Sequence, residues 1–180
     1  MIIFTIIFTI FVVYIFFCAV AYETMENFYI YGGVKSLPFP RKRWLYYFLQ
    51  FTWGLPMNLI GAGVALGLLC FGHKPKRYGW NFCFELPVNF GLELGIFFIA
   101  PKNGSTHTKN HEVGHAVQNI YLGPLTIGVV SIPSAVRFWA REIKRKCGKT
   151  ITTKYDDIWF EGQATQTGFK FIEEIKKRED

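Results

Sequence analysis

The sequence predicts a mainly α-helical membrane protein with two N-terminal transmembrane helices, a short β-hairpin and a helical C-terminal core that has a partly membrane-inserted segment. Composition is the first indication, because the 180-residue chain is 51% hydrophobic and 18% aromatic, which is apolar for a soluble domain of this size. The second indication is that two long apolar runs occupy its N-terminal part. The chain therefore divides into a two-span membrane anchor, residues 1–72, and a C-terminal domain, residues 73–180.

The first apolar run, residues 2–22, contains no charged side chain. At 1.5 Å per residue, a helix of this length crosses a bilayer hydrocarbon core of about 30 Å. A cleaved signal peptide is the alternative, because Ala19-Val20-Ala21 resembles a cleavage site. The run has no positively charged start and is long for a signal peptide, so a retained transmembrane helix is favoured.

The second apolar run, residues 44–72, is flanked by basic residues on both sides. Tryptophan and tyrosine residues gather near its start, as they do where helices pass through the membrane interface. Pro56 is expected to kink this helix, and a stripe of glycines inside it allows close packing of a neighbouring helix. We predict a second transmembrane helix here.

Two short segments of alternating polarity, residues 82–86 and 92–96, follow the anchor. They predict a β-hairpin with its turn near Pro87–Gly91. A third span over residues 84–100 is the alternative, but two glutamates lie inside it, and charges are costly in a bilayer. Ser105 is one of three hydroxyl residues able to cap the helix that follows.

Residues 111–115 read His-Glu-Val-Gly-His, the pattern HExxH. On a helix, His111 and His115 lie on one face, one turn apart, where two imidazoles can share one metal ion. Glu112 lies about a quarter turn around the helix from His111, so its carboxylate can reach a water molecule on the metal rather than the metal itself. His107 continues the four-residue spacing, but the turn residues before it indicate a position at the start of the helix.

A catalytic zinc ion typically has three protein ligands, and the third is expected near the C-terminus. The four cysteines form no CxxC pair, which argues against cysteine ligands. Glu161, Ala164, Thr165 and Gly168 share one helical face at spacings of three and four residues. This face presents one carboxylate among small residues, so a second helix can approach closely enough to bring Glu161 to the histidines.

An HExxH motif followed by a helical glutamate in an aromatic-Glu-x-x-Ala setting, here Phe160 to Ala164, resembles the gluzincin class of zinc metallopeptidases. Two spans ahead of the motif are similar to the membrane metallopeptidases of the CAAX-processing and heat-shock types. The resemblance covers roughly residues 105–172 and consists of motifs. It implies a helical HExxH metallopeptidase core, so residues 73–180 would be a zinc metallopeptidase-like catalytic domain.

The resemblance also implies a role for each matching residue. Glu112 would be the catalytic general base. The ligands of a Zn²⁺ cofactor would be His111, His115 and Glu161. The membrane peptidases usually carry an aspartate four residues after the ligand glutamate, to orient a ligand histidine, and here that residue is Thr165. Asp156 or Asp157 could take over this supporting role.

A third apolar stretch, residues 120–140, lies between the two motifs. A full membrane crossing there would separate His115 from Glu161, so the stretch should either dip into the membrane and return or pack as buried core. Residues 73–180 carry 16 of the 20 lysines and arginines. The positive-inside rule then places the catalytic domain of this multi-pass integral membrane protein in the cytoplasm.

We therefore expect a small integral-membrane zinc metallopeptidase that hydrolyses a peptide bond in a peptide or protein substrate near the membrane. The net charge of +7, next to long apolar runs, indicates an anionic lipid bilayer as partner, and no nucleic-acid-binding motif accompanies it. A strand just before the HExxH helix would either hold an extended peptide or merely cover that helix. Two alternatives remain: a metal-dependent lipid amidase or esterase, and a non-enzymatic membrane assembly protein with a vestigial HExxH.

Overall fold

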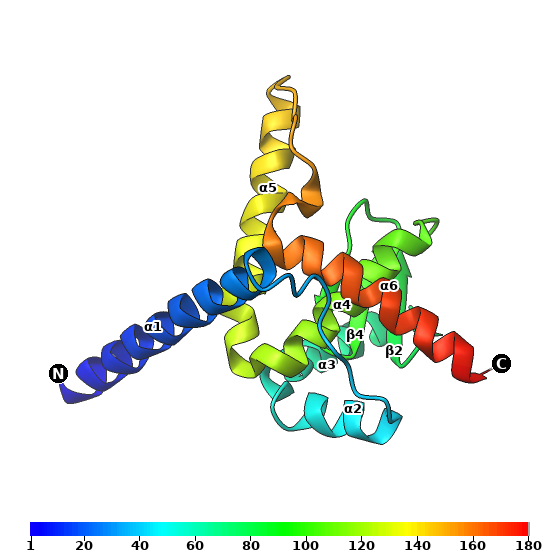
Figure 1. Ribbon diagram of the computed structural model, residues 1–180. Helices are drawn as coiled ribbons and strands as arrows, with labels where there is room; N and C mark the ends of the chain where they lie inside the picture. The colour runs from blue at the N-terminus through cyan, green and yellow to red at the C-terminus, as the bar shows by residue number, and fades with distance from the viewer. Residues whose placement is uncertain (180) are drawn as a thin grey trace.

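The structure is a computed structural model that describes residues 1–179, and it is mainly helical with one small sheet, as predicted (Figure 1). The helices are α1 (Ile2–Ile30), α2 (Arg43–Phe51), α3 (Leu55–Cys70), α4 (Thr106–Leu122), α5 (Ile132–Lys146) and α6 (Trp159–Glu179). The strands are β1 (Lys76–Tyr78), β2 (Asn81–Leu86), β3 (Leu92–Leu94) and β4 (Phe97–Pro101).

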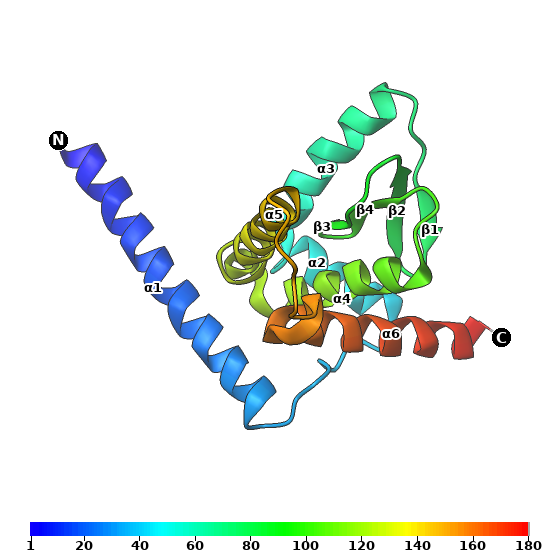
Figure 2. The same ribbon diagram turned by 90° about the horizontal axis from the view of Figure 1, so that it is seen from above.

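Helix α1 is long and apolar enough to cross a membrane, as expected for residues 2–22. Only 6% of its most apolar 18-residue window is buried, and the helix projects away from the rest of the molecule in both views (Figures 1 and 2). Its C-terminal half contacts the body, because Cys18 and Tyr22 pack in a cluster with Trp159 and Phe160.

The predicted second transmembrane helix, residues 44–72, is not confirmed as a single span. The run is divided into α2 and α3, which meet at 91°. Pro56 lies in the first turn of α3, where its missing N–H breaks no helical hydrogen bond. The Asn58 amide donates to Gln50 Oε1 at 2.8 Å and to the Gly54 carbonyl at 2.9 Å. A buried polar network therefore holds this corner, although Phe51, Trp53 and Leu55 at the corner are exposed.

The prediction that residues 82–86 and 92–96 pair with each other as a β-hairpin is wrong. The strand order is β1-β2-β4-β3, with β2 and β4 parallel and β3 and β4 antiparallel. Gly95 has a φ of +76°, and its N–H donates to Glu93 Oε1 at 2.5 Å. This tight turn reverses the chain directly after β3, so β3 pairs with β4, and β4 occupies the place next to β2.

Helices α4 and α6 lie side by side and carry both motifs (Figures 1 and 2). Two glycines make the contact close. A Cβ atom on Gly114 would overlap the backbone of Ala164, and one on Gly168 would overlap the backbone of Asn110. The helix pair packs on the sheet through a core that includes Val113. The small-residue face predicted for residues 161–168 is therefore the contact face.

The third apolar stretch, residues 120–140, follows a broken path. Helix α4 ends at Gly123, where φ is +54°, and two short helical turns lead into α5, so the helical axis bends by 116°. The Tyr14 hydroxyl of α1 donates to the Pro124 carbonyl at 3.0 Å and fixes this bend against α1. The stretch is therefore not one straight helix, in agreement with the expectation of a broken path.

Candidate metal centre

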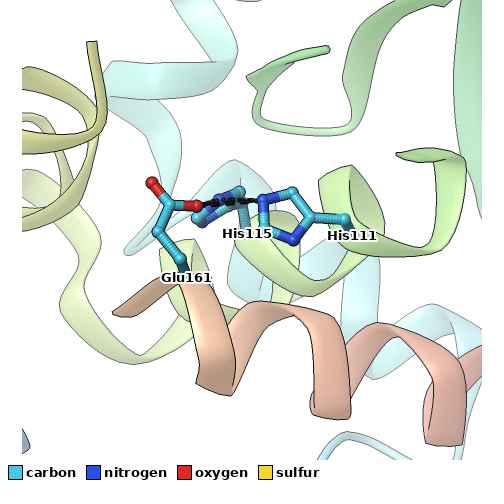
Figure 3. Close-up of side chains that lie close together, drawn as sticks. All are labelled: His111, His115 and Glu161. Atoms are coloured by element: carbon cyan, nitrogen blue, oxygen red, sulfur yellow. Dashed lines mark hydrogen bonds and ion pairs between the residues drawn. The ribbon is translucent and has the colours of Figure 1, made fainter. Parts of the chain in front are cut away.

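Three buried side chains from α4 and α6 converge on one point (Figure 3). The Glu161 Oε2 atom lies 3.0 Å from His111 Nε2 and 3.2 Å from His115 Nε2, and the two Nε2 atoms are 3.0 Å apart. One helical turn separates the histidines, and the close contact of α4 with α6 brings in Glu161. The predicted group therefore lies together and could hold a metal ion.

The separations within the group are close to those that a metal ion requires. In a tetrahedral zinc site with bonds of about 2.0–2.1 Å, neighbouring donor atoms are about 3.3–3.4 Å apart. The three observed separations are 3.0, 3.0 and 3.2 Å, a nearly equilateral triangle slightly smaller than this. Two imidazole nitrogens and one carboxylate oxygen are also an ordinary donor set for a transition metal ion. The residues present therefore fit a metal.

Thr165 and Asp156 fix the orientation of the His111 ring. The Thr165 hydroxyl donates to Asp156 Oδ2 at 2.9 Å, so its oxygen accepts from His111 Nδ1–H at 2.7 Å. A proton on Nδ1 leaves Nε2 with a free lone pair directed at the other two ligand atoms. Asp156 thus supports His111 through Thr165, whereas Asp157 accepts from the Lys154 backbone N–H instead.

Gln118 has the same function for His115. Its amide nitrogen donates to the Phe160 carbonyl at 2.9 Å and to Gln163 Oε1 at 3.1 Å, which turns its Oε1 atom toward the ring. That oxygen accepts from His115 Nδ1–H at 2.8 Å. Both histidines therefore direct Nε2 toward Glu161, and when both Nε2 atoms are unprotonated, as metal binding requires, three acceptor atoms face one another.

Such a cluster of acceptors requires positive charge. Burial alone would raise the pKa of Glu161, but hydrogen bonds from the two histidines outweigh it and hold that pKa well below its usual value. Burial alone would lower the pKa of His115, yet Glu161 and the nearby carboxylates raise it to about 9. In the metal-free protein a proton thus supplies the charge that a metal cation would otherwise supply. Glu161 Oε1 is buried and has no partner among residues 1–179.

Glu112 lies next to the metal-binding group and is buried, with 5% of its surface exposed. Burial raises the pKa of its carboxyl to about 8, and the charges of Glu161 and Glu93 add to this effect, while His115 opposes it. A carboxyl group with a pKa near neutrality can both accept and return a proton at physiological pH. Glu112 therefore has the properties expected of a general base.

A cleft of about 580 Å³ opens over the metal-binding group and is lined by His111, Glu112 and His115. Strand β3 is at the edge of the sheet, and its residues Leu92 and Glu93 form one wall of this cleft. Helix α5 contributes another wall. The cleft thus combines buried polar groups at its base with apolar and aromatic walls, as ligand sites usually do.

The cleft is also lined by Tyr155 and His107, but not by Tyr121. Tyr155 lines the cleft, with its ring 6.2 Å from the His111 ring between centroids. Tyr121 lies elsewhere and donates to the Pro38 carbonyl at 2.6 Å. His107 occupies the first turn of α4, as expected, where its Nε2 atom is 4.0 Å from Asp156 Oδ2.

Gly91 is a residue of the site that sequence reasoning missed. We predicted only that it belongs to a turn, but a Cβ atom at this position would overlap the carboxylate of Glu112. Glycine therefore leaves the space that the Glu112 side chain occupies beside β3. The local sequence carries no signal for this role, because only the folded chain brings Gly91 to α4.

Comparisons of this chain with protein-family models, with curated proteins and with solved structures found no match.

Proposed function

We propose that this protein is a small membrane-anchored zinc metallopeptidase that hydrolyses peptide bonds. One observation carries the proposal: the Nε2 atoms of His111 and His115 and the Oε2 atom of Glu161 converge in a buried triangle beside Glu112. Three protein ligands are the number that leaves a position open for a reactant at a catalytic zinc ion.

When bound, zinc supplies a Lewis acid that polarises a carbonyl group and acidifies water. The other tasks belong to the chain itself. Glu112, buried beside the three ligand atoms, accepts a proton from the attacking water and donates it to the leaving amine. The supports of the two histidines, Thr165 and Gln118, hold the rings in the tautomer that binding requires.

Tyr155 is the candidate donor for the oxygen of the scissile carbonyl group. Its ring lies over the cleft next to His111, and its hydroxyl oxygen is 3.2 Å from Ser134 Oγ. Burial and the charge of Glu161 raise the Tyr155 pKa well above its usual value. The hydroxyl therefore keeps its proton and can donate a hydrogen bond to developing negative charge.

Strand β3 favours a peptide over a lipid as the substrate. It is an edge strand that lines the cleft beside Glu112, and the backbone of an edge strand can pair with an extended peptide. A lipid amide or ester offers no complementary row of backbone groups. The lipid amidase or esterase is therefore the second candidate, favoured by the apolar wall of the same cleft.

We further propose that α1 alone crosses the membrane. A multi-pass arrangement would require the bent pairs α2–α3 and α4–α5 to cross as broken helices. The corner of α2 and α3 is instead tied to α4, because Gln50 Nε2 donates to the Ala116 carbonyl at 2.8 Å. A cytoplasmic location of residues 73–180 follows from their 16 lysines and arginines.

Hydrolysis by the full-length protein in lipid nanodiscs tests the function. We expect zinc-loaded protein to cleave members of a quenched fluorescent peptide library. The Glu112→Gln variant should retain zinc but lose at least about 100-fold in turnover, which is the smallest usual contribution of a general base. Glu173→Gln, a change at an exposed glutamate of α6, is the matched control and should be fully active. Cleavage of lipid amides without cleavage of peptides would select the second candidate.

Unchanged activity of Glu112→Gln would contradict the proposed role of this residue. Zinc-loaded protein that cleaves neither class of substrate would support the non-enzymatic alternative, in which the metal group is structural.

A further inference from the structure

Helix α5 exposes a continuous apolar stripe. Ile132, Val136, Trp139 and Ile143 repeat at spacings of four, three and four residues, which places them on one face of the helix. Between 56% and 63% of the surface of each side chain is exposed, and no residue of α5 is buried. A soluble surface helix rarely presents such a row of large apolar residues to water.

The other faces of α5 are strongly basic. The helix contains five lysines and arginines and one acidic residue, Glu142. Arg145 forms an ion pair with Glu142, whereas Arg137 and Arg141 donate to backbone carbonyl groups of residues 153–155, which leave their charge unneutralised. An apolar stripe with a tryptophan, flanked by basic residues, is the pattern of a helix that lies in the interface of an anionic membrane.

The position of α5 relative to α1 agrees with such a location. The turn before α5 packs on α1, because a Cβ atom at Gly128 would touch Cys18 Sγ at 2.5 Å. Cys18 lies four residues, or about 6 Å of helix, before Tyr22, the last residue of the uncharged run. Interfacial helices lie about 5–10 Å inside the boundary between headgroups and acyl chains. Helix α5 thus begins at the depth of a membrane interface when α1 spans the bilayer.

The direction of α5 also agrees with a location in the membrane interface. In both views the helix runs across α1 rather than along it (Figures 1 and 2). A spanning α1 follows the membrane normal, so α5 then follows the membrane plane. The cleft above His111 and His115 is lined by Ser134, Phe138 and the stripe residue Trp139 of this helix.

We propose that α5 is an interfacial helix that binds the anionic surface of the membrane in which α1 is anchored. Its apolar stripe enters the boundary between headgroups and acyl chains, and its lysines and arginines contact lipid phosphates and carboxylates. This docking places the cleft at the membrane surface. The cleft can then reach segments of substrate proteins that lie next to the substrates' own membrane anchors. The proposal depends on the fold and the charge of α5 and does not require a bound metal or hydrolytic activity.

Spin labels on the full-length protein in vesicles test this location. Cys70 and Cys147 are exposed and are first replaced by serine, and a nitroxide is then attached through Val136→Cys on the stripe or Lys144→Cys on the basic side. In vesicles of phosphatidylcholine with phosphatidylserine, the label at position 136 should be accessible to oxygen and shielded from a water-soluble nickel complex. The label at position 144 should show the opposite preference, and Ile143→Cys provides a second site on the stripe.

The charge contribution is measured with the same label. Each basic residue near an anionic surface contributes about 1 kcal/mol, so removing one by Lys146→Gln should lower the ratio of docked to undocked label at position 136 about fivefold. Pure phosphatidylcholine vesicles should also lower this ratio. Equal access of the nickel complex to positions 136, 143 and 144 would overturn the proposal. Shielding of positions 136 and 143 from both reagents would also overturn it, because the stripe would then be covered by protein.

Discussion

Replacing Thr165 with valine removes one hydroxyl group from the support of His111 and preserves the shape of the side chain. In the native site this hydroxyl accepts from His111 Nδ1–H at 2.7 Å and donates to Asp156 at 2.9 Å. The valine variant leaves Nδ1–H without an acceptor in a buried position and frees the ring to rotate or change tautomer. We expect the metal affinity to fall and the fold to remain intact.

Two estimates of the size of this effect agree. Loss of a group that supports a metal-binding histidine usually lowers metal affinity about 10–100-fold. A buried donor without an acceptor costs about 1–3 kcal/mol, which corresponds to about 5–150-fold in a dissociation constant. The zinc dissociation constant of Thr165→Val should therefore rise about 10–100-fold. Thr165→Ser retains the hydroxyl and should bind zinc with nearly native affinity.

Competition with a chromogenic chelator, carried out on detergent-solubilised full-length protein, measures these constants. Asp156→Asn should weaken binding in the same direction, because the carboxylate accepts from the Thr165 hydroxyl that supports His111. The double variant with Thr165→Val should then bind no more weakly than Thr165→Val alone, since both changes interrupt one chain of hydrogen bonds. Native affinity of Thr165→Val, or equal losses for the valine and serine variants, would refute this reasoning.

Two further predictions concern packing and pH. A Cβ atom on Gly114 would lie 2.5 Å from the Ala164 carbonyl carbon, which is much closer than an ordinary contact of 3.4–4 Å. The Gly114→Ala variant should therefore force α4 and α6 apart and lower the zinc affinity at least about tenfold. Gly63→Ala, where a Cβ meets open space on α3, is the control, and equal zinc affinities for the two variants would exclude the close contact as the cause. Burial raises the pKa of Glu93 from 4.5 to about 7, so the folded metal-free protein binds this proton more tightly than the unfolded chain. Its contribution to stability is thus present below pH 4.5 and is lost as the pH rises through about 7, on the order of 3 kcal/mol in total. Melting temperatures across this range should fall less for Glu93→Gln than for the native protein, and parallel curves would show that Glu93 does not titrate as described.

The parts of the site that depend on local spacing could be predicted from the sequence. His111 and His115 share a helical face at any HExxH motif, and a glutamate among small residues indicated the contact face of α6. The network around them depends on residues brought together by folding. Gln118 shows this dependence, because only the positions of Phe160 and Gln163 determine which of its atoms faces His115.

The errors in the fold have a common physical origin in long-range contacts. Residues 44–72 have the length and polarity of a span, yet Gln50 and Asn58 inside that run hydrogen-bond to other parts of the protein and hold a bend. Two polar amides in an apolar run were a signal against a straight span. Strand pairing also depends on distant segments, and only the turn at Gly95 determines that β3 pairs with β4.

Metal content of the purified full-length protein tests whether His111, His115 and Glu161 bind a zinc ion. Elemental analysis by mass spectrometry, after exchange into metal-free buffer, is applied to the native protein, to Glu161→Ala and to the exposed control Glu173→Ala. We expect about one zinc ion per chain in the native protein and the control, as for a site with three protein ligands, and almost none in Glu161→Ala. A native protein that retains no metal after loading with zinc, or a Glu161→Ala variant that retains as much as the control, would contradict it.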